Sequence, residues 1–149
     1  MARSTKPSGG RSTQRPPSQP TFFLDENLGG KTVTGLLRDA GISVERFLEH
    51  FTPGLPDDAW IPDVTARGWI IVTTDSKFRY HENERRALQA AGAKVFKLSA
   101  AQLRGAEQAA ILLKAIPKMI RMAERTAPPF MASVTKAGDV AIRWPEPER

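Results

Sequence analysis

The feature that most constrains the fold of this chain is the apolar run Gly68-Trp69-Ile70-Ile71-Val72-Thr73-Thr74-Asp75, which ends on an acidic residue. Bulky and β-branched residues without polar alternation are typical of a strand that is buried on both faces of a parallel sheet. A second apolar run, Phe22-Phe23-Leu24-Asp25-Glu26, ends in the same way. In open α/β sheets the usual ligand site lies outside the carboxyl ends of the strands. The two runs therefore predict two strands that each deliver a carboxylate to one edge of a sheet.

Length and composition predict one soluble domain. The chain has 149 residues, of which 40% are hydrophobic, and this is enough for one domain with a core. It contains no cysteine, which excludes disulfides and thiolate metal sites and favours a reducing, cytoplasmic location. No apolar run approaches the roughly 20 residues that span a bilayer, so we expect no membrane association.

The basic charge is concentrated at the N-terminus. The net charge is +6, and the first 20 residues contain four basic residues and no acid, which leaves 18 basic and 16 acidic residues in the remainder. Segment 1–20 is rich in Ser, Pro, Gly and Arg and has few apolar residues, so we expect a disordered basic arm. Such an arm either contacts nucleic-acid phosphates or is a solvated tail.

Strand and helix patterns alternate along most of the chain, which predicts a three-layer α/β fold with a mainly parallel sheet. Helices are expected from Val33 to Ala40, from an N-cap at Asp57 or Asp58 to Gly68, and from Glu82 to Ala91. Lys94–Leu98 alternates apolar and charged residues, a pattern that suits a strand at the edge of the sheet.

The C-terminal third carries a helix and then a hairpin. Ser99 is expected to cap a long amphipathic helix over Ala101–Arg125, broken or kinked near Pro117. Two short apolar runs on either side of Lys136–Asp139 predict a β-hairpin. The expected organisation is therefore a basic arm at 1–20, an α/β domain at 21–127, and a hairpin at 128–149 appended to the same domain.

Three aspartates are the main candidates for a functional site. Asp25 and Asp75 end strands, and Asp57 opens a helix whose apolar stripe it shares, so the predicted topology brings all three to one edge. Crowded carboxylates have raised pKa values unless a cation neutralises them. Hard oxygen ligands favour Mg²⁺ or Mn²⁺. The alternative for each aspartate alone is a structural role as a turn former or helix cap.

Carboxylate-held metal is the usual machinery for cutting phosphodiesters, because the ion lowers the pKa of bound water and stabilises the leaving oxygen. Basic residues follow Asp75 in the sequence and are candidates for contacting phosphates of a substrate: Lys77, Arg79 and His81. Glu26 and Asp58 adjoin two of the main acids and are either additional metal ligands or solvated side chains.

Three segments together resemble the PIN-domain nucleases, in particular a PIN-like subgroup related to VapC-type toxins. They are Phe22–Leu28, Leu55–Ile61 and Arg67–Asp75, within a likeness that covers about residues 21–98, and the terminal hairpin is also similar to that subgroup. The resemblance implies a Mg²⁺- or Mn²⁺-dependent ribonuclease, often the toxin of a bacterial pair that a small antitoxin protein neutralises.

The resemblance also implies roles for single residues. Asp25 and Asp75 match the strand-end acids of the family, and Asp57 looks like its helix-borne acid. PIN nucleases usually gather a fourth acid, for which the candidates here are Asp58, Glu26 and Glu82.

Other functions compatible with the same residues are a non-catalytic PIN-like module that binds nucleic acid or protein, and a receiver-like domain that accepts a phosphoryl group. The position of Lys77 in the same loop as Asp75 counts against the receiver, which draws its lysine from a later strand. The long helix and the hairpin either pack internally or form a homodimer or antitoxin surface.

Overall fold

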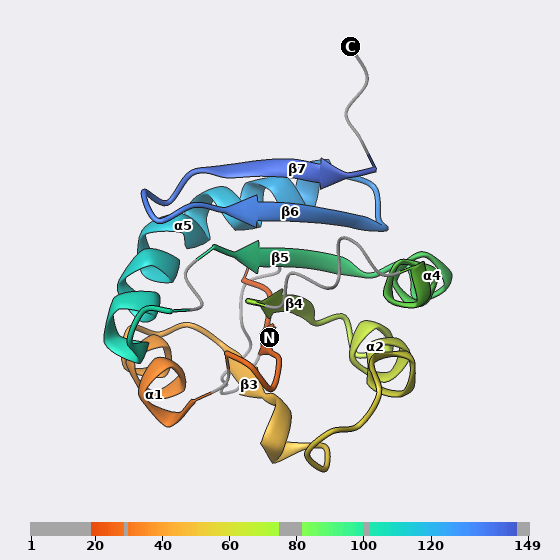
Figure 1. The fold of residues 1–149 in the computed structure, drawn as a ribbon. Helices are drawn as coiled ribbons and strands as arrows, with labels where there is room; N and C mark the ends of the chain where they lie inside the picture. Colours follow the sequence, from red (N-terminus) through yellow and green to blue (C-terminus); the bar gives the residue numbers. More distant parts are fainter. Residues whose placement is uncertain (1–18, 29, 75–81, 100–101, 146–149) are drawn as a thin grey trace, which may run out of the picture.

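The computed structural model describes residues 19–28, 30–74, 82–99 and 102–145. A single sheet with the strand order β3-β2-β4-β5-β6-β7 forms the centre (Figure 1). Neighbouring strands are parallel except for the antiparallel pair β6 and β7. The elements in chain order are β2 Phe22–Leu24, α1 Lys31–Asp39, β3 Val44–Arg46, the 3₁₀ turn η1 Phe47–Glu49, α2 Asp57–Ala66, β4 Ile70–Thr73, α4 Glu82–Ala91, β5 Lys94–Leu98, α5 Gly105–Arg125, β6 Phe130–Val134 and β7 Val140–Trp144.

The two apolar runs that end on acids form neighbouring interior strands of the sheet, β2 and β4, buried on both faces as the sequence predicts. Every residue of β2 and of β4 is buried. The two strands pair in parallel with Phe23 opposite Ile71 and Leu24 opposite Val72. Successive side chains of a strand point to opposite faces, so such continuous apolar runs require cover on both sides of the sheet.

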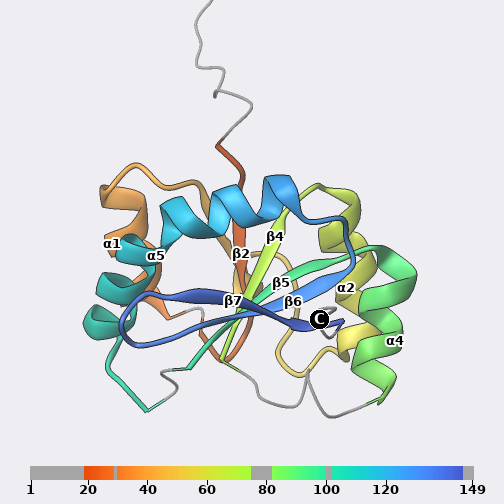
Figure 2. The same ribbon diagram turned by 90° about the horizontal axis from the view of Figure 1, so that it is seen from above.

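Helices supply that cover in two layers (Figures 1 and 2). On one face α1 and α5 pack against Phe22 and Leu24. On the other face α2 and α4 pack against Phe23 and Ile71. The three-layer α/β architecture expected from the alternating pattern is therefore confirmed, and each face has its own hydrophobic cluster.

The prediction that Lys94–Leu98 forms an edge strand is wrong. This strand, β5, lies inside the sheet, with β4 on one side and β6 on the other. Its lysines are only partly buried, and the ammonium group of Lys94 donates a hydrogen bond to the carbonyl oxygen of Ala123 at 3.1 Å. The alternating lysines of β5 therefore do not indicate an edge position. They indicate side chains that extend past the sheet to polar partners or solvent. The C-terminal hairpin is joined to the sheet through the parallel pair β5 and β6.

Two predicted helix starts also differ from the structure. Helix α5 begins at Gly105, not after Ser99, because the backbone N–H of its N-cap Arg104 donates to the Glu107 carboxylate at 3.1 Å. It then continues through Pro117 to Arg125 as one helix. Helix α2 has Pro56 as its N-cap, so Asp57 is its first helical residue. Acids in the first turn stabilise a helix through its dipole without capping it.

The parallel strands run in one direction, so their carboxyl ends lie at the same edge of the sheet (Figure 2). Within the described residues, none of the helices has the length and apolarity that a membrane span needs. The edge at the carboxyl ends of β2, β4, β5 and β6 is therefore the place to examine for a site.

Candidate functional site at the carboxyl edge of the sheet

Asp25 is a buried acid, with only 4% of its surface exposed, at the carboxyl end of β2. Its oxygen Oδ1 accepts hydrogen bonds from the backbone N–H groups of Asn27 at 3.0 Å and Leu28 at 3.2 Å. Its oxygen Oδ2 accepts a short hydrogen bond from the hydroxyl group of Thr73. Hydrogen bonds to a carboxylate favour its ionised form, so three donors hold a buried negative charge in one orientation.

Thr73 is a member of the site that the sequence interpretation did not identify. It is the last residue of β4 and has no exposed surface. Alternation puts its side chain on the face of Ile71, the face that also carries Asp25 and Phe23. The signal in the sequence was a hydroxyl residue at the end of an otherwise apolar run.

Asp57 is half-buried at the start of α2. Its Oδ1 accepts a hydrogen bond at 3.1 Å from the indole N–H of Trp60, one helical turn later. The ring of Trp60 packs on that of Phe23, with the ring centroids 5.4 Å apart. Asp57 is therefore linked through Trp60 to β2, two residues before Asp25.

Glu26 and Asp58, the neighbours of these two acids, are both exposed. Glu26 accepts a hydrogen bond from the backbone N–H of Gly54 at 3.1 Å. This bond joins the end of β2 to the loop that precedes α2, three residues before Asp57. The remaining candidates, Asp75, Lys77, Arg79 and His81, lie outside the described residues.

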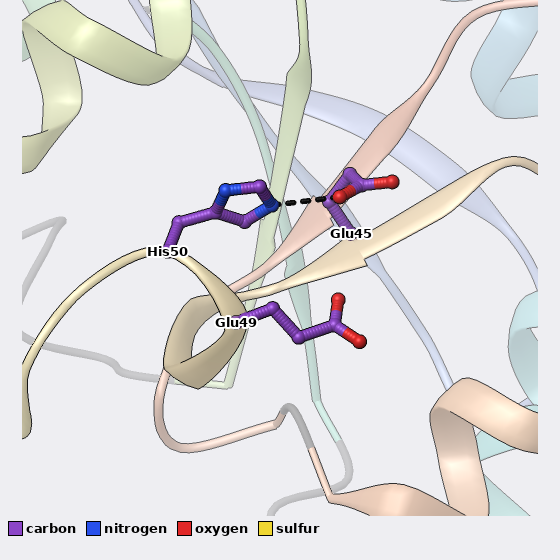
Figure 3. A group of neighbouring side chains, drawn as sticks. All are labelled: Glu45, Glu49 and His50. Carbon is purple, nitrogen blue, oxygen red and sulfur yellow. Dashed lines mark hydrogen bonds and ion pairs between the residues drawn. The ribbon is translucent and has the colours of Figure 1, made fainter.

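A second group of ionisable side chains, at β3 and η1, was not expected from the sequence. Oxygen or nitrogen atoms of Glu45, Glu49 and His50 lie within 4.8 Å of one another (Figure 3). The Nε2 atom of His50 is 2.7 Å from a Glu45 oxygen. Glu49 binds both terminal nitrogens of Arg38, at 2.8 and 3.1 Å, and accepts the Arg46 backbone N–H at 3.0 Å.

The Glu49 carboxylate is thus engaged by the protein itself. The hydrogen bond from Arg38 lowers the pKa of Glu49 below its usual value and raises the pKa of Arg38. Arg38 pairs with Glu49 and also donates to the carbonyl oxygen of Val44, so the evident effect of the pair is to fasten η1 to α1 and β3.

The all-oxygen donors at the carboxyl edge suit a hard divalent cation. Asp25 is oriented by three donors and Asp57 by an indole N–H, so the protein itself positions both carboxylates. The residues present therefore fit the carboxylate-bound metal that the sequence resemblance implies.

Comparison with known proteins agrees with this architecture. The family described as "PIN like domain" matches residues 20–100 of the chain. The chain is also 31% identical over 117 residues, 76% of its length and 84% of the relative, to the protein named "Putative ribonuclease VapC45" of Mycobacterium tuberculosis (strain ATCC 25618 / H37Rv). No solved structure matches the chain. The chain belongs to the PIN-like domain family.

Proposed function

We propose that this protein is a metal-dependent endoribonuclease in which Asp25, Asp57 and Asp75 hold a Mg²⁺ or Mn²⁺ ion. The observation that carries the proposal is the buried, triply hydrogen-bonded carboxylate of Asp25 at the carboxyl edge of a parallel sheet. The name of its relative, a ribonuclease, supports RNA as the substrate. Asp75 follows Thr73, the last residue of β4, by two positions in the sequence.

When bound, such an ion would activate a water molecule and stabilise the charge on the phosphodiester. The contribution of the chain is to fix the carboxylates. Thr73 and two backbone N–H groups orient Asp25, and Trp60 orients Asp57. Lys77, Arg79 and His81 are proposed to contact the RNA phosphates, and either Glu26, Asp58 or Glu82 to supply a fourth acid.

We further propose that the protein acts in the cytoplasm as the toxin of a toxin-antitoxin pair, with a small antitoxin protein as its partner. The VapC name of the relative supports this role. If a small reading frame adjoins the gene, its co-expression should restore growth to cells that the nuclease inhibits. Growth inhibition that persists in the Asp25→Asn variant would contradict a toxicity based on RNA cleavage.

The nuclease proposal is tested by incubating the purified protein with a structured RNA in Mg²⁺, Mn²⁺ or EDTA. We expect cleavage that needs the ion and is lost in Asp25→Asn and Asp75→Asn. Asp139→Asn is the matched control, since Asp139 lies in the hairpin turn with 73% of its side chain exposed. Circular dichroism of each variant checks folding.

Equal cleavage by wild type and Asp25→Asn would contradict the proposal. If no sample cleaves RNA but all bind it, the non-catalytic binding module becomes the better description.

A further inference from the structure

A cavity of about 280 Å³ opens on the sheet beside the acidic edge. Its polar lining consists of side chains from β5, β6, β7 and the residues that follow β5 and β6: Lys97, Ser99, Ser133, Thr135 and Arg143. Met131 and Ala132 complete the wall. Among the described residues that line the cavity, none is acidic.

Strand alternation explains why these side chains share one face. Val95 and Met131 belong to the cluster under α2 and α4, and Lys97 and Ser133 follow each of them by two positions in the same strand. Lys97 and Ser133 are also register partners. The helices cover the beginnings of β5 and β6, where Val95 and Met131 are buried, whereas Lys97 and Ser133 remain partly exposed.

The cavity carries positive charge from Lys97 and Arg143. No ion pair among the described residues involves Lys97 or Arg143. The Nε–H group of Arg143 donates a hydrogen bond to the hydroxyl oxygen of Ser133 at 3.0 Å. This bond orients the guanidinium group, whose planar fork matches the oxygens of a phosphate. Two cations together with three hydroxyl groups are a donor set for an anion.

One residue that lines the cavity, Lys97, lies on the strand next to the Asp25–Thr73 pair. Lys97 is the register partner of Thr73 on the neighbouring strand, and Thr73 donates to Asp25. Adjacent strands lie about 4.8 Å apart, so the cavity begins one strand from the Asp25–Thr73 pair and extends away from it over β6 and β7. A polynucleotide crossing the strand ends from Asp25 would therefore bring a neighbouring backbone phosphate over Lys97 and Arg143.

We propose that this cavity is a phosphate-binding subsite for the RNA strand that is cut at Asp25. Two cations with hydroxyl donors suit the anionic oxygens of the backbone, which every RNA sequence carries. The path of the RNA from Asp25 to the cavity rests on the proposed ribonuclease function. Binding of RNA at the cavity does not require that the RNA be cut. The subsite assigns Lys97 and Arg143 to substrate binding, a role that their positions in the sequence did not suggest.

The test measures binding in EDTA, so that no RNA is cut. A fluorescein-labelled single-stranded RNA is titrated with the full-length protein and followed by fluorescence anisotropy at several salt concentrations. Lys97→Gln and Arg143→Gln should each weaken binding by about three- to tenfold. Each should also reduce the slope of log K against log salt by about 0.7, the value for one phosphate contact of a single strand.

Lys118→Gln is the matched control. Lys118 is exposed on α5, which covers the opposite face of the sheet, so its loss should leave the affinity less affected than loss of Lys97. Arg143→Lys keeps the charge without the fork and should recover part of the affinity lost in Arg143→Gln. Inorganic phosphate, titrated as a competitor, separates occupation by a free anion from occupation by the RNA backbone.

The outcomes for the subsite and for the nuclease can be told apart. If the double variant Lys97→Gln/Arg143→Gln binds RNA with unchanged affinity and salt slope, the subsite is refuted, whether or not the protein cleaves RNA. If RNA binding weakens but the wild type cleaves nothing, the subsite stands and the nuclease fails. Competition by millimolar phosphate without any effect of the variants on RNA would identify a free-anion site and overturn the proposal.

Discussion

The hydroxyl group of Thr73 donates a hydrogen bond to the carboxylate of Asp25, and so joins the ends of two neighbouring parallel strands across 48 positions of sequence. The same two strand ends are also joined by the backbone, since the N–H of Asp25 donates to the carbonyl oxygen of Val72 at 3.1 Å. The orientation of the buried acid is therefore a property of the sheet register. A change at Thr73 should affect both folding and the site.

Thr73→Val tests this link, because valine has nearly the same shape and lacks the hydroxyl donor. We expect the free energy of unfolding to fall by about 1–3 kcal/mol, since a buried carboxylate loses a donor. Cleavage should fall by about 10- to 100-fold, as is typical when a residue that orients a metal ligand is removed. Urea unfolding and RNA cleavage measure the two effects. Thr73→Ser, which keeps the hydroxyl, should retain most activity, and equal activity of Thr73→Val would refute the orienting role.

Trp60→Phe tests the support of Asp57. Phenylalanine keeps an aromatic ring against Phe23 but removes the indole N–H that Asp57 accepts. We expect the Mn²⁺ concentration that gives half-maximal cleavage to rise by about tenfold. Trp69→Phe is the control, since Trp69 also stacks on Phe23, with ring centroids 5.9 Å apart, but is not the indole that donates to Asp57. If both variants need the same Mn²⁺ concentration for half-maximal cleavage, the indole N–H of Trp60 does not orient Asp57 for metal binding.

Glu26 can be assigned as a tether or as a metal ligand by comparing two substitutions. Glu26→Gln keeps an acceptor oxygen for the Gly54 N–H and removes the charge, whereas Glu26→Ala removes both. If Glu26 is a tether, Glu26→Gln should cleave RNA like the wild type and Glu26→Ala should cleave more slowly, with faster hydrogen exchange at the Gly54 amide. Loss of cleavage in Glu26→Gln would instead identify Glu26 as the fourth acid.

The Arg38–Glu49 pair should make stability depend on pH in the acid range. Arg38 lowers the folded-state pKa of Glu49 below its ordinary value of 4.5, so the unfolded state takes up its proton first as the pH falls. The pair therefore contributes fully above pH 4.5, and the contribution is lost as the pH falls through the lower folded-state pKa. Because both side chains are about a third or more exposed, we expect no more than about 1 kcal/mol.

The measurement is urea unfolding of wild type and Glu49→Gln between pH 3 and pH 7. The difference between the two proteins should be largest near neutrality, shrink towards pH 3, and decrease in high salt. A difference that is constant with pH would show that the hydrogen bonds, and not the charge, account for the contribution.

Local patterns sufficed for the elements that are governed by neighbouring residues. The continuous apolar runs of β2 and β4 require burial on both faces, and the helical periodicity with a closing glycine placed α1 and α4 correctly. Local patterns failed where the position of a strand depended on contacts with residues far away in the sequence. The alternating sequence of β5 did not show that this strand lies inside the sheet. Its interior position comes from its pairing with β6, in which Lys94 is the register partner of Phe130, 36 residues later in the chain.

Local sequence alone predicts two buried parallel strands that are each followed by an acid. The continuous apolar runs indicate the strands, and the acids come directly after these runs in the chain. Only the tertiary structure decided which groups meet. The bond from Thr73 to Asp25, the indole support of Asp57 and the cavity of Lys97 and Arg143 all depend on strand order, register and helix packing. Such contacts join residues that are far apart in the chain or that come from different strands, and the free energy that selects them comes from burying the whole sheet between its helices.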